Sequence, residues 1–210
     1  MQLKEIEKLA ASVMEKAVDA KEVAGVNLLV LKDKAPVLSL QAGYADLENK
    51  VLMEDDTIMR LYSMSKPITA ACMMILMQRG LVDLNDPVSK FIPAFANQTY
   101  VNGNALSLVQ RPMTVHDLLF MTSGLSYGSD SAAGKATSDL FAEMDARLST
   151  KDAMTTREFA DRVGKNPLEF EPSSNFMYGI SADILGALIE VISGMSFAEF
   201  LKKEITDPLE

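Results

Sequence analysis

Residues 60–70 read Arg-Leu-Tyr-Ser-Met-Ser-Lys-Pro-Ile-Thr-Ala, and this stretch places a candidate nucleophile at the start of a helix. Pro67 has the φ angle of a helix and lacks an N–H group that a first turn leaves unpaired anyway, so a helix is expected to begin close to Ser63. Apolar residues then recur at intervals of three and four until Gly80, which is expected to end the helix. Because Ser63 and Lys66 are three residues apart, their side chains share one helical face. A serine, a candidate base and the electropositive end of a helix therefore lie together.

The Ser-x-x-Lys spacing is weak by itself, because a serine that caps a helix and a lysine in solvent give the same pattern. Four longer blocks give it context. They are residues 56–67, which contain Ser63 and Lys66; residues 80–88, Gly-Leu-Val-Asp-Leu-Asn-Asp-Pro-Val; residues 113–125, with Met-Thr-Val-His-Asp-Leu-Leu and Thr-Ser-Gly-Leu; and residues 176–190, with Phe-Met-Tyr-Gly-Ile-Ser around Tyr178.

In this order the blocks resemble the serine β-lactamase and penicillin-binding-protein superfamily, and most closely its class C β-lactamase-like branch, which includes esterases, transesterases and D-amino-acid peptidases. The resemblance extends over residues 25–208. It implies an α+β fold of the β-lactamase-like type, mostly helical in this chain, with an N-terminal helix and β-hairpin. Residues 1–56 would form the N-terminal part of an α/β domain, and residues 57–210 a mainly helical domain that carries both motifs.

The resemblance also implies roles for individual residues. Ser63 would be the nucleophile that forms an acyl-enzyme, and Lys66 and Tyr178 would share the removal of its proton. A nearby cation favours a tyrosinate, whereas burial favours a neutral lysine, so which of the two is the base stays open. Tyr127 and Ile180 are expected to line the substrate site.

Two features depart from the family pattern. Ile180 occupies the place where the β-lactamases of the family usually have an asparagine that binds the substrate amide, which favours esters over β-lactams. In the family, the third motif lies on a strand near the C-terminus, well after a Pro-Leu block. The matching Pro-Leu of this sequence is at residues 208–209, inside the block where the sequence ends. The C-terminal sheet strands are therefore expected to be missing, the chain alone to be an incomplete catalyst, and a C-terminal segment or a second chain to complete the sheet.

A competing nucleophile motif occurs at residues 124–128, where Gly-Leu-Ser-Tyr-Gly matches the Gly-x-Ser-x-Gly elbow of α/β-hydrolases. That elbow needs a strand before its serine, a helix after it and a histidine later in the chain. A helix is expected before Ser126, and His116, the single histidine, precedes it. Ser126 is therefore interpreted as a loop residue.

Composition limits the partners and cofactors. A net charge of −9 and a pI near 4.7 argue against binding to nucleic acid or to an anionic membrane. The single cysteine, Cys72, excludes an intrachain disulfide, and with one histidine no zinc-type cluster is expected, so neither a metal nor a cofactor is predicted. The N-terminus lacks the apolar core of a signal peptide, so a cytoplasmic location is expected, although export remains open if a signal was removed.

Local patterns predict the remaining elements. Residues 25–31 and 36–42 are expected to form a hairpin whose first strand is covered on both faces, with no further strand to flank it. Thr114 is expected to cap a helix in a capping box with Asp117. The other expectations are a helix at 2–20, a polar connection at 43–56, a loop or small hairpin at 98–111, a mobile loop at 123–138, and helices at 115–121, 140–148, 156–163, 175–192 and 197–205.

Together these features predict a serine hydrolase that acts through an acyl-enzyme on Ser63, with small carboxylic esters as the first-choice substrates. β-Lactamase or D-amino-acid peptidase activity is the alternative within the superfamily. A non-catalytic or truncated β-lactamase-like domain is the alternative from another class.

Overall fold

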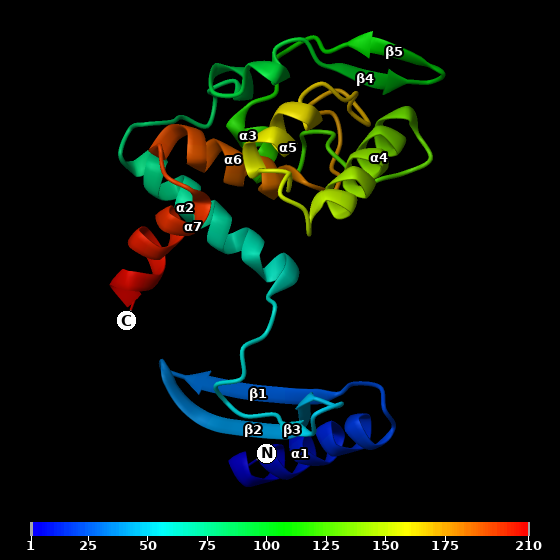
Figure 1. The fold of residues 1–210 in the computed structure, drawn as a ribbon. Coiled ribbons are helices and arrows are strands. Elements are labelled where there is room, and N and C mark those ends of the chain that lie inside the picture. Colours follow the sequence, from blue (N-terminus) through cyan, green and yellow to red (C-terminus); the bar gives the residue numbers. More distant parts are fainter. Residues whose placement is uncertain (1, 210) are drawn as a thin grey trace. The chain divides into compact units, whose positions relative to one another are not determined.

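The computed structural model describes residues 2–209, which divide into two compact units at residues 61 and 62. Each unit is described separately, and Figure 1 shows the elements of both. Unit 1 contains one helix and a small sheet: α1 (Leu3–Asp19), β1 (Gly25–Lys32), β2 (Ala35–Asp46) and β3 (Val51–Leu52). Unit 2 is mainly helical: α2 (Ser65–Gln78), β4 (Thr99–Asn102), β5 (Ala105–Leu108), α3 (Val115–Leu119), α4 (Ala132–Arg147), α5 (Thr156–Val163), α6 (Ser181–Ser193) and α7 (Phe197–Leu201).

The sheet of unit 1 is antiparallel, in the order β1-β2-β3. The expected hairpin is present, and Asp33 and Lys34 make its two-residue turn with φ angles of 51° and 65°. Positive φ at both central residues is the geometry of a type I′ turn, which matches the twist of paired strands. At the other end of the hairpin, Gly25 pairs with Gly43, where the strands and Ala24 approach too closely for a side chain.

Two expectations for this unit were wrong. The stretch expected to be a polar connection contains the last residues of β2 and the short strand β3, so the hairpin has a third strand beside it. The second half of β1 is also not covered on both faces, since Leu29 and Leu31 are 56% and 57% exposed. The reason is that α1 packs mainly against β2.

The core of unit 2 forms around α2 and α6, which lie against each other (Figure 1). Both helices are strongly apolar, and α6 buries most of its circumference. A 3₁₀ turn, Tyr62–Met64, leads into α2, and Gly80 follows its end with φ 69°, as expected for a helix stop. The helix α6 begins at Ser181, later than the expected 175, because the preceding segment is irregular and carries Tyr178.

The segments that flank the core agree with the sequence to different degrees. The capping box of Thr114 and Asp117 is confirmed, and α5 has the expected bounds, with Thr155 as its cap. The helix α4 begins at Ala132, inside the stretch expected to be a loop, because the Ser131 hydroxyl accepts a hydrogen bond from the Gly134 amide and caps it.

Three smaller features complete unit 2. The strands β4 and β5 form the small hairpin that the sequence allowed at 98–111. The last expected helix is regular only over α7, and a π-helical turn, Lys202–Thr206, follows it. Among residues 2–209, no single helix is long and apolar enough to cross a membrane. Taken together, α6 and residues 197–209 have the required length and apolar composition, but the two segments are bent by 81° relative to each other.

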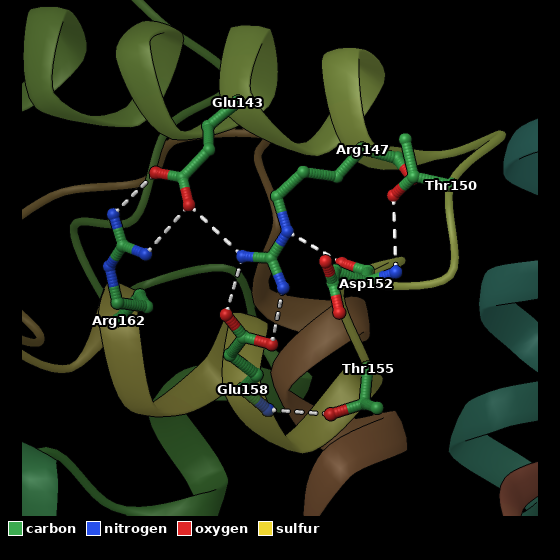
Figure 2. A network of polar contacts seen from close by, with 7 residues as sticks. All are labelled: Glu143, Arg147, Thr150, Asp152, Thr155, Glu158 and Arg162. Atoms are coloured by element: carbon green, nitrogen blue, oxygen red, sulfur yellow. Dashed lines mark hydrogen bonds and ion pairs between the residues drawn. The ribbon is translucent and has the colours of Figure 1, made fainter.

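A network of ion pairs joins α4 to α5 (Figure 2). The Arg147 guanidinium donates to Glu158 at 2.6 and 3.0 Å and to Glu143 at 3.0 Å, and Arg162 donates to Glu143 at 3.1 and 2.7 Å. The Arg162 hydrogen bonds, followed by those of Arg147, lower the pKa of Glu143 from 4.5 to about 2. Because this pKa is depressed, the network stabilises the fold fully above the ordinary glutamate range and weakens only as the pH falls toward 2.

Candidate active site

The 3₁₀ turn Tyr62–Met64 and the first turn of α2 that follows it bring Ser63 and Lys66 together. Lys66 Nζ donates a hydrogen bond to Ser63 Oγ at 3.2 Å, as their spacing on one helical face predicted. Ser63 is exposed to solvent, whereas Lys66 is partly buried. The residue before Ser63, Tyr62, has a φ of 48°, which is unusual for an aromatic residue and concentrates backbone strain next to the serine.

Two tyrosines from separate segments converge on Lys66. Its Nζ donates to Tyr127 Oη at 2.7 Å and lies 4.7 Å from the centroid of the Tyr178 ring. The two rings are tilted against each other, with centroids 6.1 Å apart. The lysine ammonium therefore joins the serine hydroxyl to a pair of phenol groups.

The segments that carry the tyrosines touch through their backbones next to Gly179. A Cβ on Gly179 would lie 2.0 Å from the carbonyl oxygen of Leu125, so only glycine permits this approach. The amide of Met177 donates to the carbonyl of Met121 at 2.9 Å. The hydroxyls of Ser123 and Ser181 also share a buried hydrogen bond of 2.8 Å. These contacts fix Tyr127 and Tyr178 relative to each other.

The buried carboxylate of Asp117 holds the start of the Tyr127 segment in place through hydrogen bonds. It accepts two hydrogen bonds of 2.8 Å from Arg111, one of 2.9 Å from the Thr114 amide and one of 3.2 Å from the Thr122 hydroxyl. Burial raises the pKa of Asp117, but the bonds from Arg111 and Thr114 lower it by more, so its pKa lies below the ordinary value. Asp117 therefore stays ionised and ties α3 to the irregular segment that follows it, through Thr122.

The site shifts the pKa values of Lys66 and Tyr178 in opposite directions. Burial lowers the pKa of Lys66, but hydrogen bonding to Tyr127 and Tyr178 raises it by more, so the balance lies above the ordinary lysine value. Hydrogen bonding with Ser63, and then with Lys66, lowers the pKa of the Tyr178 phenol against a smaller opposing effect of desolvation. The arrangement thus favours a protonated lysine beside an ionisable tyrosine.

A cavity of about 290 Å³ opens beside Ser63. Its wall combines Lys66 and Tyr127 with residues from the start of α6, among them Ala182 and Asp183. Asp183 is accessible to solvent and also enclosed by enough protein that burial raises its pKa, as happens on a concave wall. No pattern in the sequence marks Asp183 for this role, beyond its place five residues after Tyr178.

The structure brings four of the five expected site residues together, namely Ser63, Lys66, Tyr127 and Tyr178. The exception is Ile180, which was expected to line the substrate site. Its side chain is 0% exposed and belongs to the hydrophobic core. The substrate-facing role expected for Ile180 is therefore wrong.

Ser126, the serine of the competing motif, is tied into a different network. It is 5% exposed, and its hydroxyl donates to Glu169 at 3.0 Å. The same carboxylate accepts from Ser129 at 2.7 Å and from Ser131 at 2.8 Å. No sequence pattern predicted Glu169, which anchors residues 126–131 through these three serines.

The residues that the structure describes include no cluster suited to a metal. Within residues 2–209, no group of three or more histidine, cysteine, aspartate or glutamate side chains lies close enough to hold one. His116 stacks on Phe120, with ring centroids 4.3 Å apart.

Comparison with known proteins gives consistent matches. The family model described as Beta-lactamase matches residues 10–210. Esterase EstB of Burkholderia gladioli is 29% identical over 203 residues, which are 94% of this chain and 48% of EstB. Penicillin-binding protein 4* of Bacillus subtilis is 28% identical over 169 residues, which are 79% of this chain and 32% of that protein.

Solved structures agree with these matches. EstCE1, described as a hydrolase with promiscuous acyltransferase activity, has a TM-score of 0.80 and 28% identity, covering 99% of this chain and 52% of its own. The octameric penicillin-binding protein homologue from Pyrococcus abyssi has a TM-score of 0.73 and 27% identity, and the match covers 100% of this chain and 43% of the homologue. This chain thus spans about half the length of EstB and EstCE1 and less of the other two.

Proposed function

Because the chain belongs to the Beta-lactamase family, we propose that it transfers the acyl group of a carboxylic ester to Ser63 and then releases it by hydrolysis. The observation that carries this proposal is the position of Lys66 Nζ, which bonds Ser63 Oγ at 3.2 Å and Tyr127 Oη at 2.7 Å beside the Tyr178 ring. A serine without histidine needs another group to take its proton, and here the Lys66 cation lies beside the Tyr178 phenol, whose pKa it helps to lower. The similarity to EstB and EstCE1 supports hydrolysis of esters.

In the proposed mechanism, Tyr178 is the base and Lys66 stays cationic. The Ser63 oxygen attacks the ester carbonyl as its proton moves to the Tyr178 oxygen, whose pKa is lowered. When the tetrahedral intermediate collapses, the bond to the alcohol breaks and Tyr178 returns the proton to the departing oxygen. A water molecule then repeats the sequence on the acyl-enzyme and releases the carboxylic acid.

Two features of the Ser63 cavity favour neutral esters over β-lactams and D-amino-acid peptides. Within the described chain, no asparagine or glutamine lines this cavity, so a substrate amide would find no side-chain amide to pair with there. Leaving a buried amide unpaired costs about 1–3 kcal/mol. The Asp183 carboxylate on the wall would also repel the carboxylate that β-lactams and peptide C-termini carry.

We expect a catalytically complete form of the protein to hydrolyse a short p-nitrophenyl ester with a higher kcat/KM than a chromogenic cephalosporin. Both rates should vanish in Ser63→Ala. In Asp183→Ala, which removes the charge without adding an amide, loss of the repulsion should raise kcat/KM for the cephalosporin about twofold to fivefold and leave the neutral ester nearly unchanged. A higher kcat/KM for the cephalosporin in the unmodified protein would instead favour the β-lactamase or peptidase function, to which the similarity to penicillin-binding protein 4* also points.

A further inference from the structure

A second, larger cavity of about 390 Å³ adjoins the one beside Ser63. The two cavities share four wall residues, namely Ser65, Thr69, Ala182 and Asp183. Its remaining wall is mostly apolar and comes from α4, α5, α7 and the loop before α5: Phe141, Met144, Met154, Phe159 and Phe197.

Aromatic contacts continue from one cavity into the other. The ring of Tyr127, at Ser63, stacks on Phe141 with centroids 6.5 Å apart. Phe141 in turn contacts Phe159, with centroids 5.7 Å apart. The apolar cavity is therefore an extension of the Ser63 site.

Gly186 marks the open space on the α6 side. The residue is buried in the interior of a helix, yet a Cβ built on it would meet no atom within 4 Å. A glycine at such a place weakens the helix relative to alanine and leaves the space beside it empty. The helices α4 and α5, which supply another part of the wall, are joined by ion pairs (Figure 2). These ion pairs stabilise the position of that wall.

We infer that this cavity is the binding pocket for the apolar acyl chain of the substrate, which makes esters of medium-chain fatty acids the preferred class. The inference rests on the proposed function, because it places the acyl carbonyl at Ser63 and the chain beyond Ala182 and Asp183. The walls offer a thioether-rich and aromatic surface and no cation, which suits an alkyl chain and disfavours an anionic one.

Alkyl p-nitrophenyl phosphonates test the inference without needing turnover, since the phosphorus takes the place of the acyl carbon on Ser63. Ethyl, butyl and octyl phosphonates are reacted with the full-length protein, and labelling is followed by intact mass. The second-order rate constant should rise with chain length, by up to roughly fourfold for each methylene that enters the pocket. In Gly186→Leu, whose side chain would fill the space, the ratio of the octyl rate to the ethyl rate should fall toward one.

Ala146→Leu is the matched control, because it adds the same side chain to an exposed position of α4. It should retain the full dependence on chain length. Equal rates for ethyl and octyl in a protein that is labelled at Ser63, or an unchanged octyl advantage in Gly186→Leu, would overturn the inference. So would a thermal midpoint of Gly186→Leu far below that of Gly186→Ala, because the space would then be filled by another part of the protein. Absence of labelling by any of the phosphonates would instead reject the proposed function itself.

Discussion

Lys66→Ala, Tyr178→Phe and the double variant are expected to acylate equally slowly, each about a hundredfold to ten-thousandfold below a catalytically complete wild type. The reason is that the two side chains share one proton transfer, so the loss of either removes the same step. The burst of p-nitrophenol in a stopped-flow experiment measures acylation directly. If the loss in the double variant equals the sum of the two single losses on a logarithmic scale, the residues act independently and the shared role is wrong.

The pH dependence separates their roles. Tyr178 accepts the proton only as a phenolate, and its pKa is lowered from 10.0, so the acylation rate should rise with pH through a value below 10.0. Removing the Lys66 charge should move this rise to higher pH, because the cation no longer stabilises the phenolate. The chain has five tyrosines and no tryptophan, so tyrosinate absorbance reports the same titration independently of activity. An early titration that persists in Tyr178→Phe would assign the lowered pKa to another group.

Gly179→Ala is expected to lower acylation at least roughly a hundredfold, although the residue carries no functional group. The new Cβ would lie 2.0 Å from the Leu125 carbonyl oxygen, which is backbone and cannot rotate away. The Tyr127 and Tyr178 segments must therefore separate, and Lys66 loses the geometry that joins them to Ser63. Burst kinetics measure the loss, and circular dichroism shows whether the fold persists.

Gly194→Ala is the control for stability alone. It lies at the other end of α6 with φ 70°, and a Cβ there meets no atom within 4 Å. The substitution should strain the helix end and lower the thermal midpoint, while the acylation rate of the folded protein stays unchanged. Equal acylation rates in Gly179→Ala and wild type would show that the close approach of the two segments does not build the site.

The sequence predicted those parts of the structure that depend on local spacing. The pairing of Ser63 with Lys66 follows from one turn of helix, and the capping box at Thr114 follows from side chains three residues apart. The strand β3 was missed because a strand of two residues has too few side chains to show alternation. The start of α4 was missed because glycine, serine and alanine are equally common in loops, and only the Ser131 cap distinguishes them.

The parts of the site that depend on long-range contacts could not be predicted from the residues alone. Tyr127 and Tyr178 are distant in sequence, and their meeting depends on Gly179, whose need for space becomes visible only beside Leu125. The burial of Ile180 likewise depends on where α6 begins, which propensity placed too early. Glu169 and Asp183 act through neighbours from other segments, and no local pattern marks them.

The most direct test of the account is the mass of the protein after treatment with a serine-directed phosphonate, in wild type, Ser63→Ala and Ser126→Ala. Ser63 is exposed and bonded to Lys66, whereas Ser126 is buried and donates to Glu169. We predict one added phosphonyl group in wild type and in Ser126→Ala, and none in Ser63→Ala. Labelling that persists in Ser63→Ala and disappears in Ser126→Ala would contradict the account.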